Sequence, residues 1–237
     1  MGINSGPDIV EDGLVLCLDA GNRRSYPGTG TGWFDLSGNG YDFNVSASAY
    51  STSDGIDHMN FEGSFGIAKR IVGGSLTDMP TFANATICVF SEVITPTNWR
   101  TMLRGAANDH QVIIQSGTND LGMYDNDGGN FIDSTFNIDS IPNYDTKFNY
   151  MCWRLSQSSP YYQFQYNNDT TVYSITNVNS TFNNGFCCIG GFHEFNAITT
   201  SASQYWGKMA YFSYYNRHLS SEEISQNFNA LRGRFGI

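Results

Sequence analysis

The chain consists of short apolar runs separated by polar segments rich in Gly, Asn, Asp and Ser. Many of these runs alternate apolar and polar residues with a period of two, which is typical of β-strands that have one buried face. We expect strands over residues 13–21, 85–94 and 206–217, of which the first and the last are mainly apolar. Turn signals recur at strand-length intervals, so the whole chain is predicted to contain about ten to fourteen strands. The first and last strands are expected to lie close together.

The last residues carry a different pattern. Ser220 or Ser221 can cap a short helix, and Glu223 follows Ser220 at the spacing of a reciprocal capping box. Ile224, Phe228 and Leu231 lie about one helical turn apart, which predicts an apolar helix face. Gly233 follows them and predicts the end of the helix. We expect this helix to close an open end of a sheet with its apolar face turned inward.

Together these elements predict the fold class. Short strands with frequent turns and one terminal helix are typical of an all-β, two-sheet antiparallel jelly-roll sandwich. The Asn39-Gly40 dipeptide and residues 125–129 are the strongest turn signals. No internal repeat, low-complexity linker or charge block divides the chain, so a single domain over residues 1–237 is predicted.

Charge excludes one class of partner. The chain has 22 acidic and 12 basic side chains, a formal net charge of −10, whereas a general nucleic-acid binder needs a basic stripe. No apolar stretch approaches the roughly 20 residues of a membrane span, so no membrane insertion is expected. The N-terminal segment lacks both a basic start and an apolar core, so no secretory signal is expected.

The five cysteines do not indicate a disulfide framework. Their number is odd and four of them lie in apolar runs, which favours reduced thiols in the core. Cys187 and Cys188 are adjacent, so on a regular strand their side chains would point to opposite faces and could not share a zinc ion.

Both ends of the chain resemble a known family. The segments are GLVLCLDAGNRRSYPGTGTGWFDLSGNGYDF at residues 13–43 and YYNRHLSSEEISQNFNALRGRFGI at residues 214–237. They resemble concanavalin A-like, laminin-G-type jelly-roll domains, in the version found in virion structural proteins of tailed, notably marine, bacteriophages. Between about residues 47 and 189 only the rhythm of strands and turns matches.

The resemblance implies two facing antiparallel sheets and a place on the virion as a decoration, fibre or adhesin module. It implies partners among other virion proteins or further copies of the chain, and for some members a bacterial surface polysaccharide or calcium. The same fold serves lectins, glucanases and structural modules, so it does not settle function.

Hydrolase chemistry is not expected. A retaining glycosidase needs two carboxylates about 5–5.5 Å apart. Related glucanases carry them in a Glu-x-Asp-x-Glu alternation, which none of the six glutamates here begins. We therefore predict a non-enzymatic protein without catalytic residues.

Calcium is the one candidate cofactor. Asp125, Asp127 and Asn130 concentrate oxygen ligands, with Asp120 and Asn126 close by in sequence. The spacing does not fit an EF-hand, and a tight hairpin turn stabilised by side-chain hydrogen bonds explains the same residues. Both interpretations remain open, and the tight turn is favoured.

Aromatic residues beside turns are the candidate glycan or partner contacts. Trp99, Tyr124, Tyr161 and Tyr162 are of this kind, together with the polar residues of the 125–130 turn. Within the family signature, Trp33 is expected to fill a sandwich edge, while Asp35 and Ser37 hold a turn through bonds to the backbone.

Two functions from different classes follow. The module attaches to a capsid or tail partner, which the absence of a trimerising shaft in the sequence slightly favours, or its rim loops bind a bacterial polysaccharide as a tail-fibre adhesin. Glycoside hydrolysis is a distant third.

Overall fold

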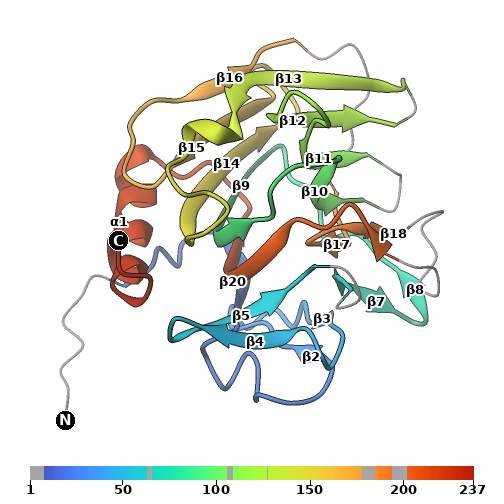
Figure 1. The fold of residues 1–237 in the computed structure, drawn as a ribbon, viewed down its shortest axis with the longest axis vertical. Coiled ribbons are helices and arrows are strands. Elements are labelled where there is room, and N and C mark those ends of the chain that lie inside the picture. Colours follow the sequence, from blue (N-terminus) through green and yellow to red (C-terminus); the bar gives the residue numbers. More distant parts are fainter. Residues whose placement is uncertain (1–7, 63–65, 106–108, 127, 178–184, 194–201) are drawn as a thin grey trace.

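A computed structural model describes residues 8–62, 66–105, 109–126, 128–177, 185–193 and 202–237. It confirms the predicted fold class, because two large antiparallel sheets pack face to face and one short α-helix lies near the C-terminus (Figure 1). In the described part of the chain, no helix is long and apolar enough to cross a membrane.

The first sheet, called sheet A, contains the first and last long strands of the described chain. Strand β1 (Leu14–Asp19) pairs with β20 (Gly207–Tyr215), from Leu14 opposite Tyr215 to Asp19 opposite Tyr211. This pairing confirms that the strands near both ends of the chain are neighbours. The order in sheet A is β16 (Tyr173–Ile175), β15 (Tyr162–Tyr166), β14 (Asn149–Ser156), β9 (Asn84–Val93), β20, β5 (Ile56–Asn60) and β4 (Tyr50–Ser53), with β1 beside β20.

The second sheet, called sheet B, is ordered β13 (Asn130–Asn137), β12 (Asp120–Asp125), β11 (His110–Ile114), β10 (Arg100–Arg104), β17 (Cys188–Ile189), β6 (Ala68–Lys69), β3 (Phe43–Asn44) and β2 (Gly32–Trp33). Two small hairpins accompany it, β7 (Ile71–Val72) with β8 (Ser75–Leu76) and β18 (Phe192–His193) with β19 (Ala202–Ser203). Helix α1 is Ser221–Leu231, and short 3-10 turns occur at Ile138–Ser140 and Arg232–Arg234.

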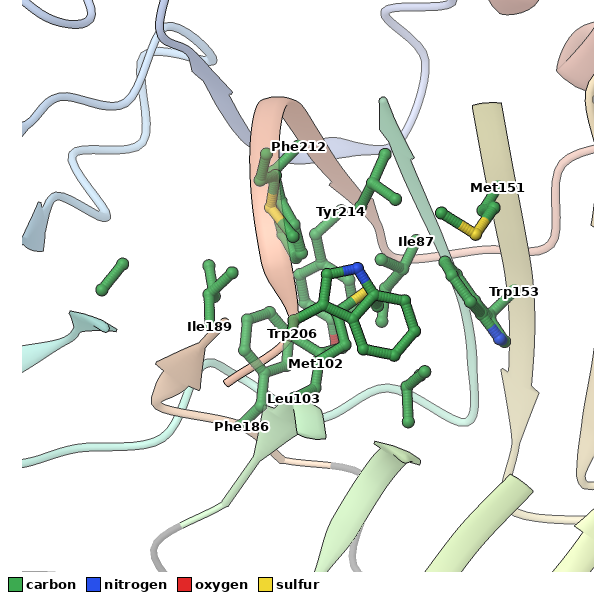
Figure 2. Close-up of a cluster of buried hydrophobic side chains, with 14 of the residues drawn as sticks. Ile87, Met102, Leu103, Met151, Trp153, Phe186, Ile189, Trp206, Phe212 and Tyr214 are labelled. Atoms are coloured by element: carbon green, nitrogen blue, oxygen red, sulfur yellow. The ribbon is translucent and has the colours of Figure 1, made fainter. Parts of the chain in front are cut away.

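The main core fills the space between the two sheets. On β9, Ile87 and Val89 point into it, and Met102 and Val112 enter from sheet B. Figure 2 shows Trp206 near the centre of this cluster, among side chains that come from both sheets. Burial of these large apolar side chains is the main favourable term in folding, at roughly 25 cal/mol per Å².

Sheet A is also covered on its outer face. The residues that alternate with the core-facing ones point to this outer face. Among them, Cys88 and Phe90 on β9 form a second cluster with Tyr150, Ile224 and Phe228. Helix α1 therefore lies across the outer face of sheet A, beside β9 and β14 (Figure 1). The expectation that it closes an open sheet end was wrong, because apolar side chains occupy both faces of β9 and one of these faces needs a separate cover.

The start of α1 has the predicted capping box. The Ser220 hydroxyl accepts the Glu223 N–H at 3.2 Å, and the Glu223 carboxylate accepts the Ser220 N–H at 2.8 Å. The α-helix ends at Leu231 with Arg232 as its C-cap, directly before Gly233, which confirms the predicted end. After Leu231 the chain continues into the 3-10 turn that contains Gly233, and the positive φ of +68° falls at Gly236 instead.

Acidification should weaken the capping box. Arg217 bonds both Glu223 oxygens, at 2.7 and 2.9 Å, and lowers the pKa of Glu223 from 4.5 to about 2. Its stabilising contribution is therefore complete above pH 4.5 and is lost as the pH falls towards 2. We expect the loss to be about 1 kcal/mol, because the pair is partly exposed. Glu223→Gln keeps a capping amide without the titration, so urea unfolding of this variant should depend less on pH in that range; equal slopes would contradict the assignment.

The residues of the first signature form a connected loop. Trp33 is fully buried on β2, at the edge of sheet B, with its ring centroid 6.3 Å from that of Phe61. The Asp35 carboxylate accepts hydrogen bonds from the backbone N–H groups of Cys17, Ser37 and Tyr41 and from the Ser37 hydroxyl. One carboxylate thus fixes the loop after β2 to strand β1.

All five cysteines are buried and reduced. For Cys187 and Cys188, the expectation that the side chains point to opposite faces was wrong, because their sulfurs lie 3.9 Å apart. The Cys187 N–H donates to the Arg104 carbonyl at 3.0 Å, and Cys188 is the residue paired with Arg104. Cys187 and Cys188 thus both lie opposite Arg104, as in a β-bulge. A bulge breaks the regular alternation of side chains that the expectation assumed.

Candidate functional site

A hollow of about 210 Å³ lies on the outer face of sheet B. Ile113 on β11 and Tyr124 on β12 line it, while their chain neighbours Val112 and Met123 point into the main core. Successive residues of a strand face opposite sides, so the hollow is on the side away from sheet A. Its full lining is Trp99, Arg104, His110, Ile113, Tyr124, Asn126 and Gln204.

Aromatic rings form one wall of the hollow. Trp99 precedes β10, and its ring meets those of Tyr124 and Phe131 edge-on, with centroids 5.5 and 5.7 Å apart. The structure thus brings together Trp99 and Tyr124, two of the predicted contact residues from separate segments of the chain. Both are only partly buried, so they remain available to a ligand.

Polar side chains form the rest of the lining. His110 is paired with Tyr124 on one side and with Arg104 on the other, so the three side chains share one face. The Thr101 hydroxyl lies 2.9 Å from His110 Nδ1 and donates to Gln204 Oε1 at 3.1 Å. Thr101 N–H also donates to the Gln204 carbonyl at 2.8 Å, which anchors Gln204 to β10.

Burial sets the charge of this lining. Desolvation, reinforced by the nearby positive charge of Arg104, lowers the pKa of His110 from 6.5 to about 3. The imidazole is therefore neutral at physiological pH and presents hydrogen-bonding nitrogens without a charge. Among the described lining residues, Arg104 is the cation and none is a carboxylate.

The 125–130 segment forms the predicted hairpin turn, in which Asp125 pairs with Asn130. Asp125 is buried and its carboxylate accepts the Gly128 N–H at 2.9 Å, while Asn130 Nδ2 donates to the Gly128 carbonyl at 2.7 Å. Asp127 lies outside the described residues. These bonds belong to the turn interpretation, and within the described ranges no three His, Cys, Asp or Glu side chains converge as metal ligands do.

The tyrosine pair at the start of β15 is split between two environments. Tyr162 is fully buried, and its hydroxyl accepts the Trp153 Nε1–H at 2.6 Å. Its prediction as a glycan contact was wrong, because alternation along the strand turns it into the core. Tyr161 is half-buried on sheet A and does not line the hollow.

A second, larger hollow of about 410 Å³ lies between residues 53–56, 146–148 and 233–236. Two of its charged side chains already form short ion pairs, Glu92 with Lys208 and Arg234 with Asp19, both at 2.6 Å. We regard it as the weaker candidate for a ligand site, because those groups are held in the fold.

Sequence reasoning missed three polar residues of the hollow, Arg104, His110 and Gln204, as well as the apolar Ile113. Arg104 and His110 end and begin apolar strands, and a polar residue there is usually a solvated strand end. Gln204 is about a hundred positions from Thr101 in the chain, and its contact with Thr101 exists only because the fold places the residue after β19 beside β10. No local pattern carries that signal.

No protein-family model matches the chain, and no curated protein matches it. Solved structures of similar fold include a sialidase of Trypanosoma rangeli in complex with sialic acid, with a TM-score of 0.55 and 14% sequence identity over 94% of this chain. The binding domain of Paraclostridial Mosquitocidal Protein 1 has a TM-score of 0.58 and 17% identity over 93%. The receptor binding domain of botulinum neurotoxin type G has a TM-score of 0.53 and 15% identity over 92%.

These similarities show the fold. The chain spans 33% of the length of the sialidase and 52% and 51% of the two toxin domains. Solved structures therefore support the two-sheet sandwich, while membership of a concanavalin A-like phage family stays a prediction.

Proposed function

We propose that the protein is a carbohydrate-binding module that uses the hollow on sheet B. The observation that carries the proposal is the convergence of Trp99 and Tyr124, from separate segments, over a small polar hollow. Aromatic rings pack against the apolar C–H face of a sugar, and amide, imidazole and guanidinium groups bond its hydroxyls. Asn126, Gln204 and His110 supply groups of this kind.

The size of the hollow favours a single sugar ring. Its volume of about 210 Å³ is below the roughly 300–1,000 Å³ of sites for drug-sized ligands. Two proteins of similar fold are a binding domain and a receptor binding domain, and a third is a sialidase in complex with sialic acid. At these low identities they support a binding role as a hypothesis for this chain.

We also propose that the module binds without cleaving. The usual glycosidase mechanism needs a pair of carboxylates, and the described residues that line the hollow include none. An assay of sugar-polymer breakdown by the purified protein tests this part separately. Release of reducing ends would contradict it even if binding were confirmed.

Replacing Trp99 by alanine should weaken sugar binding roughly tenfold or more, because it removes the larger ring of the aromatic wall. A glycan array, with and without calcium, first identifies a bound sugar, and calorimetric titration then measures its Kd for each variant. Tyr124→Phe keeps the ring and should bind nearly as well as the wild type.

The matched control is Tyr161→Ala, which removes a half-buried tyrosine on the other sheet and should leave Kd unchanged. Equal losses in Trp99→Ala and Tyr161→Ala would mean that a general loss of structure caused them. A wild type that binds no sugar on the array leaves attachment to other proteins as the better explanation.

The place of action is a further part of the proposal. The two terminal signatures favour a virion component that attaches to other virion proteins or to further copies of itself, with the sugar on a host surface. Immunogold labelling of intact phage particles with an antibody to the chain tests this. Particles that stay unlabelled, while the antibody detects the purified protein, would contradict it.

A further inference from the structure

The Cys187–Cys188 pair differs from the other thiols of the protein in its immediate surroundings. Its sulfurs are 3.9 Å apart, and both residues lie opposite Arg104 at the bulge in β17. Ile67, Leu76 and Tyr205 pack around them in a small cluster separate from the main core. The pair is buried, yet close to the outer face of sheet B.

Two cations flank Cys188. Strand β17 runs between β6 and β10, and Cys188 is paired with Lys69 on one side and with Arg104 on the other. Directly opposed residues share a face, with Cβ atoms about 4.5–5.5 Å apart. Both cations interact electrostatically with Cys188, which favours negative charge on its sulfur.

Cys187, in contrast to Cys188, is expected to stay a protonated thiol. Its hydrogen bond with Cys188, and then burial, raise the pKa of Cys187 far above 9.0. Cys187 therefore keeps its proton, and both the Cys188 sulfur and the Asp78 side chain are its hydrogen-bond partners. Cys152 also has a thiol neighbour, Cys88, and a nearby cation, Arg154, but burial is the leading cause that raises its pKa, and it lies under helix α1.

We propose that Cys188 and Cys187 form a redox-reactive vicinal dithiol, with Cys188 as the nucleophile and Cys187 as the resolving thiol towards small hydroperoxides. This proposal does not rest on sugar binding, although Arg104 belongs to both the hollow and the surroundings of the pair. Burial excludes bulky reagents, whereas hydrogen peroxide is close to water in size and can enter.

The reaction balances in two steps. The Cys188 sulfur attacks one peroxide oxygen, the O–O bond breaks, and the leaving hydroxide takes a proton to become water, which gives a sulfenic acid. The Cys187 sulfur then attacks the Cys188 sulfur, the S–O bond breaks, and a second water leaves with the Cys187 proton. The dithiol loses two electrons and the peroxide gains them.

Such a disulfide should be easily reduced. Adjacent Cα atoms are about 3.8 Å apart, below the usual 4.4–6.8 Å for bridged cysteines. Strained disulfides have high reduction potentials and are labile, so a small dithiol reductant should reverse the modification.

The test is intact mass spectrometry of the folded protein after treatment with a small molar excess of hydrogen peroxide. The wild type should lose the mass of two hydrogen atoms, recover it with dithiothreitol, and yield a peptide with linked Cys187 and Cys188. Cys187→Ser should instead gain one oxygen at Cys188, which dimedone captures once the protein is denatured. Lys69→Gln should slow the reaction several-fold, while Lys147→Gln, an exposed control, should not.

Two results would overturn the proposal. One is oxidation of Cys88 or Cys152 before the pair in the wild type. The other is a pair that stays reduced while peroxide already oxidises methionine. Both results are read from wild-type peptides, so neither depends on the variants folding, and Cys152→Ala serves as the variant control that should react like the wild type.

Discussion

Phe228→Ala is expected to lower the free energy of unfolding by about 3–5 kcal/mol, the usual cost of removing a buried phenylalanine ring. The Phe228 ring stacks on Phe90 at 6.5 Å and lies 5.9 Å from Tyr150, and the Arg232 guanidinium covers it at 5.7 Å. Truncation leaves a cavity between helix α1 and sheet A that the surrounding aromatic rings cannot fill without leaving their rotamers. Urea titration followed by tryptophan fluorescence measures the change.

Phe34→Ala is the matched control, because it makes the same chemical change at a phenylalanine that is 41% exposed. We expect it to cost less than about 1 kcal/mol. A cost well below 1 kcal/mol for Phe228→Ala would show that α1 does not depend on its contact with sheet A. Phe228→Leu should fall between the two, since it keeps part of the apolar volume.

The fold class could be predicted because its signals are local. Alternation along residues 85–94 and the apolar run over 206–217 are signals of strands, and the capping box depends on residues three positions apart. The position of α1 could not be predicted in the same way. Cys88 and Phe90 are apolar although their neighbours Ile87 and Val89 already face the main core, so both faces of this strand are expected to be buried. Nothing in the sequence says which element covers the second face.

The hollow was predicted in part, for a comparable reason. Trp99 and Tyr124 were found because aromatic residues beside turns are often exposed. Tyr162 has the same local context, yet one step along the strand turns its ring into the core, where it accepts a bond from Trp153. Gln204 joins the hollow through tertiary placement alone. A site made of residues from several segments is therefore only partly visible in sequence.

The bulge at Cys187 and Cys188 shows the limit of the strand rule. Strict alternation separates adjacent side chains, and that rule was the reason for expecting no shared zinc ion. An extra residue opposite Arg104 suspends the rule at one point. Bulges depend on the register with the partner strand, which is a property of the assembled sheet.

Asp35 connects the signature loop to the rest of the protein. Its Oδ1 accepts the N–H groups of Cys17 and Ser37 at 3.0 and 2.8 Å, and its Oδ2 accepts the Ser37 hydroxyl at 2.7 Å and the Tyr41 N–H at 3.2 Å. The Cys17 N–H belongs to a strand of sheet A that is largely buried. Loss of its acceptor leaves a donor without an equivalent bond, which costs more than the bond itself contributes.

Asp35→Ala should therefore lower the free energy of unfolding by about 2–4 kcal/mol. The variant loses several charge-assisted hydrogen bonds, and their contributions are not fully additive. Asp35→Asn should cost less, because its carbonyl oxygen can still accept at one position while its amide nitrogen cannot. Asp42→Ala is the matched control, since the Asp42 carboxylate accepts one bond, from the Asp35 N–H at 2.9 Å. Urea titration of the three variants should give the order Asp35→Ala, Asp35→Asn, Asp42→Ala in decreasing loss. If Asp35→Ala lost no more than Asp42→Ala, the loop would be held by the burial of Trp33, and the polar turn would be secondary to that ring.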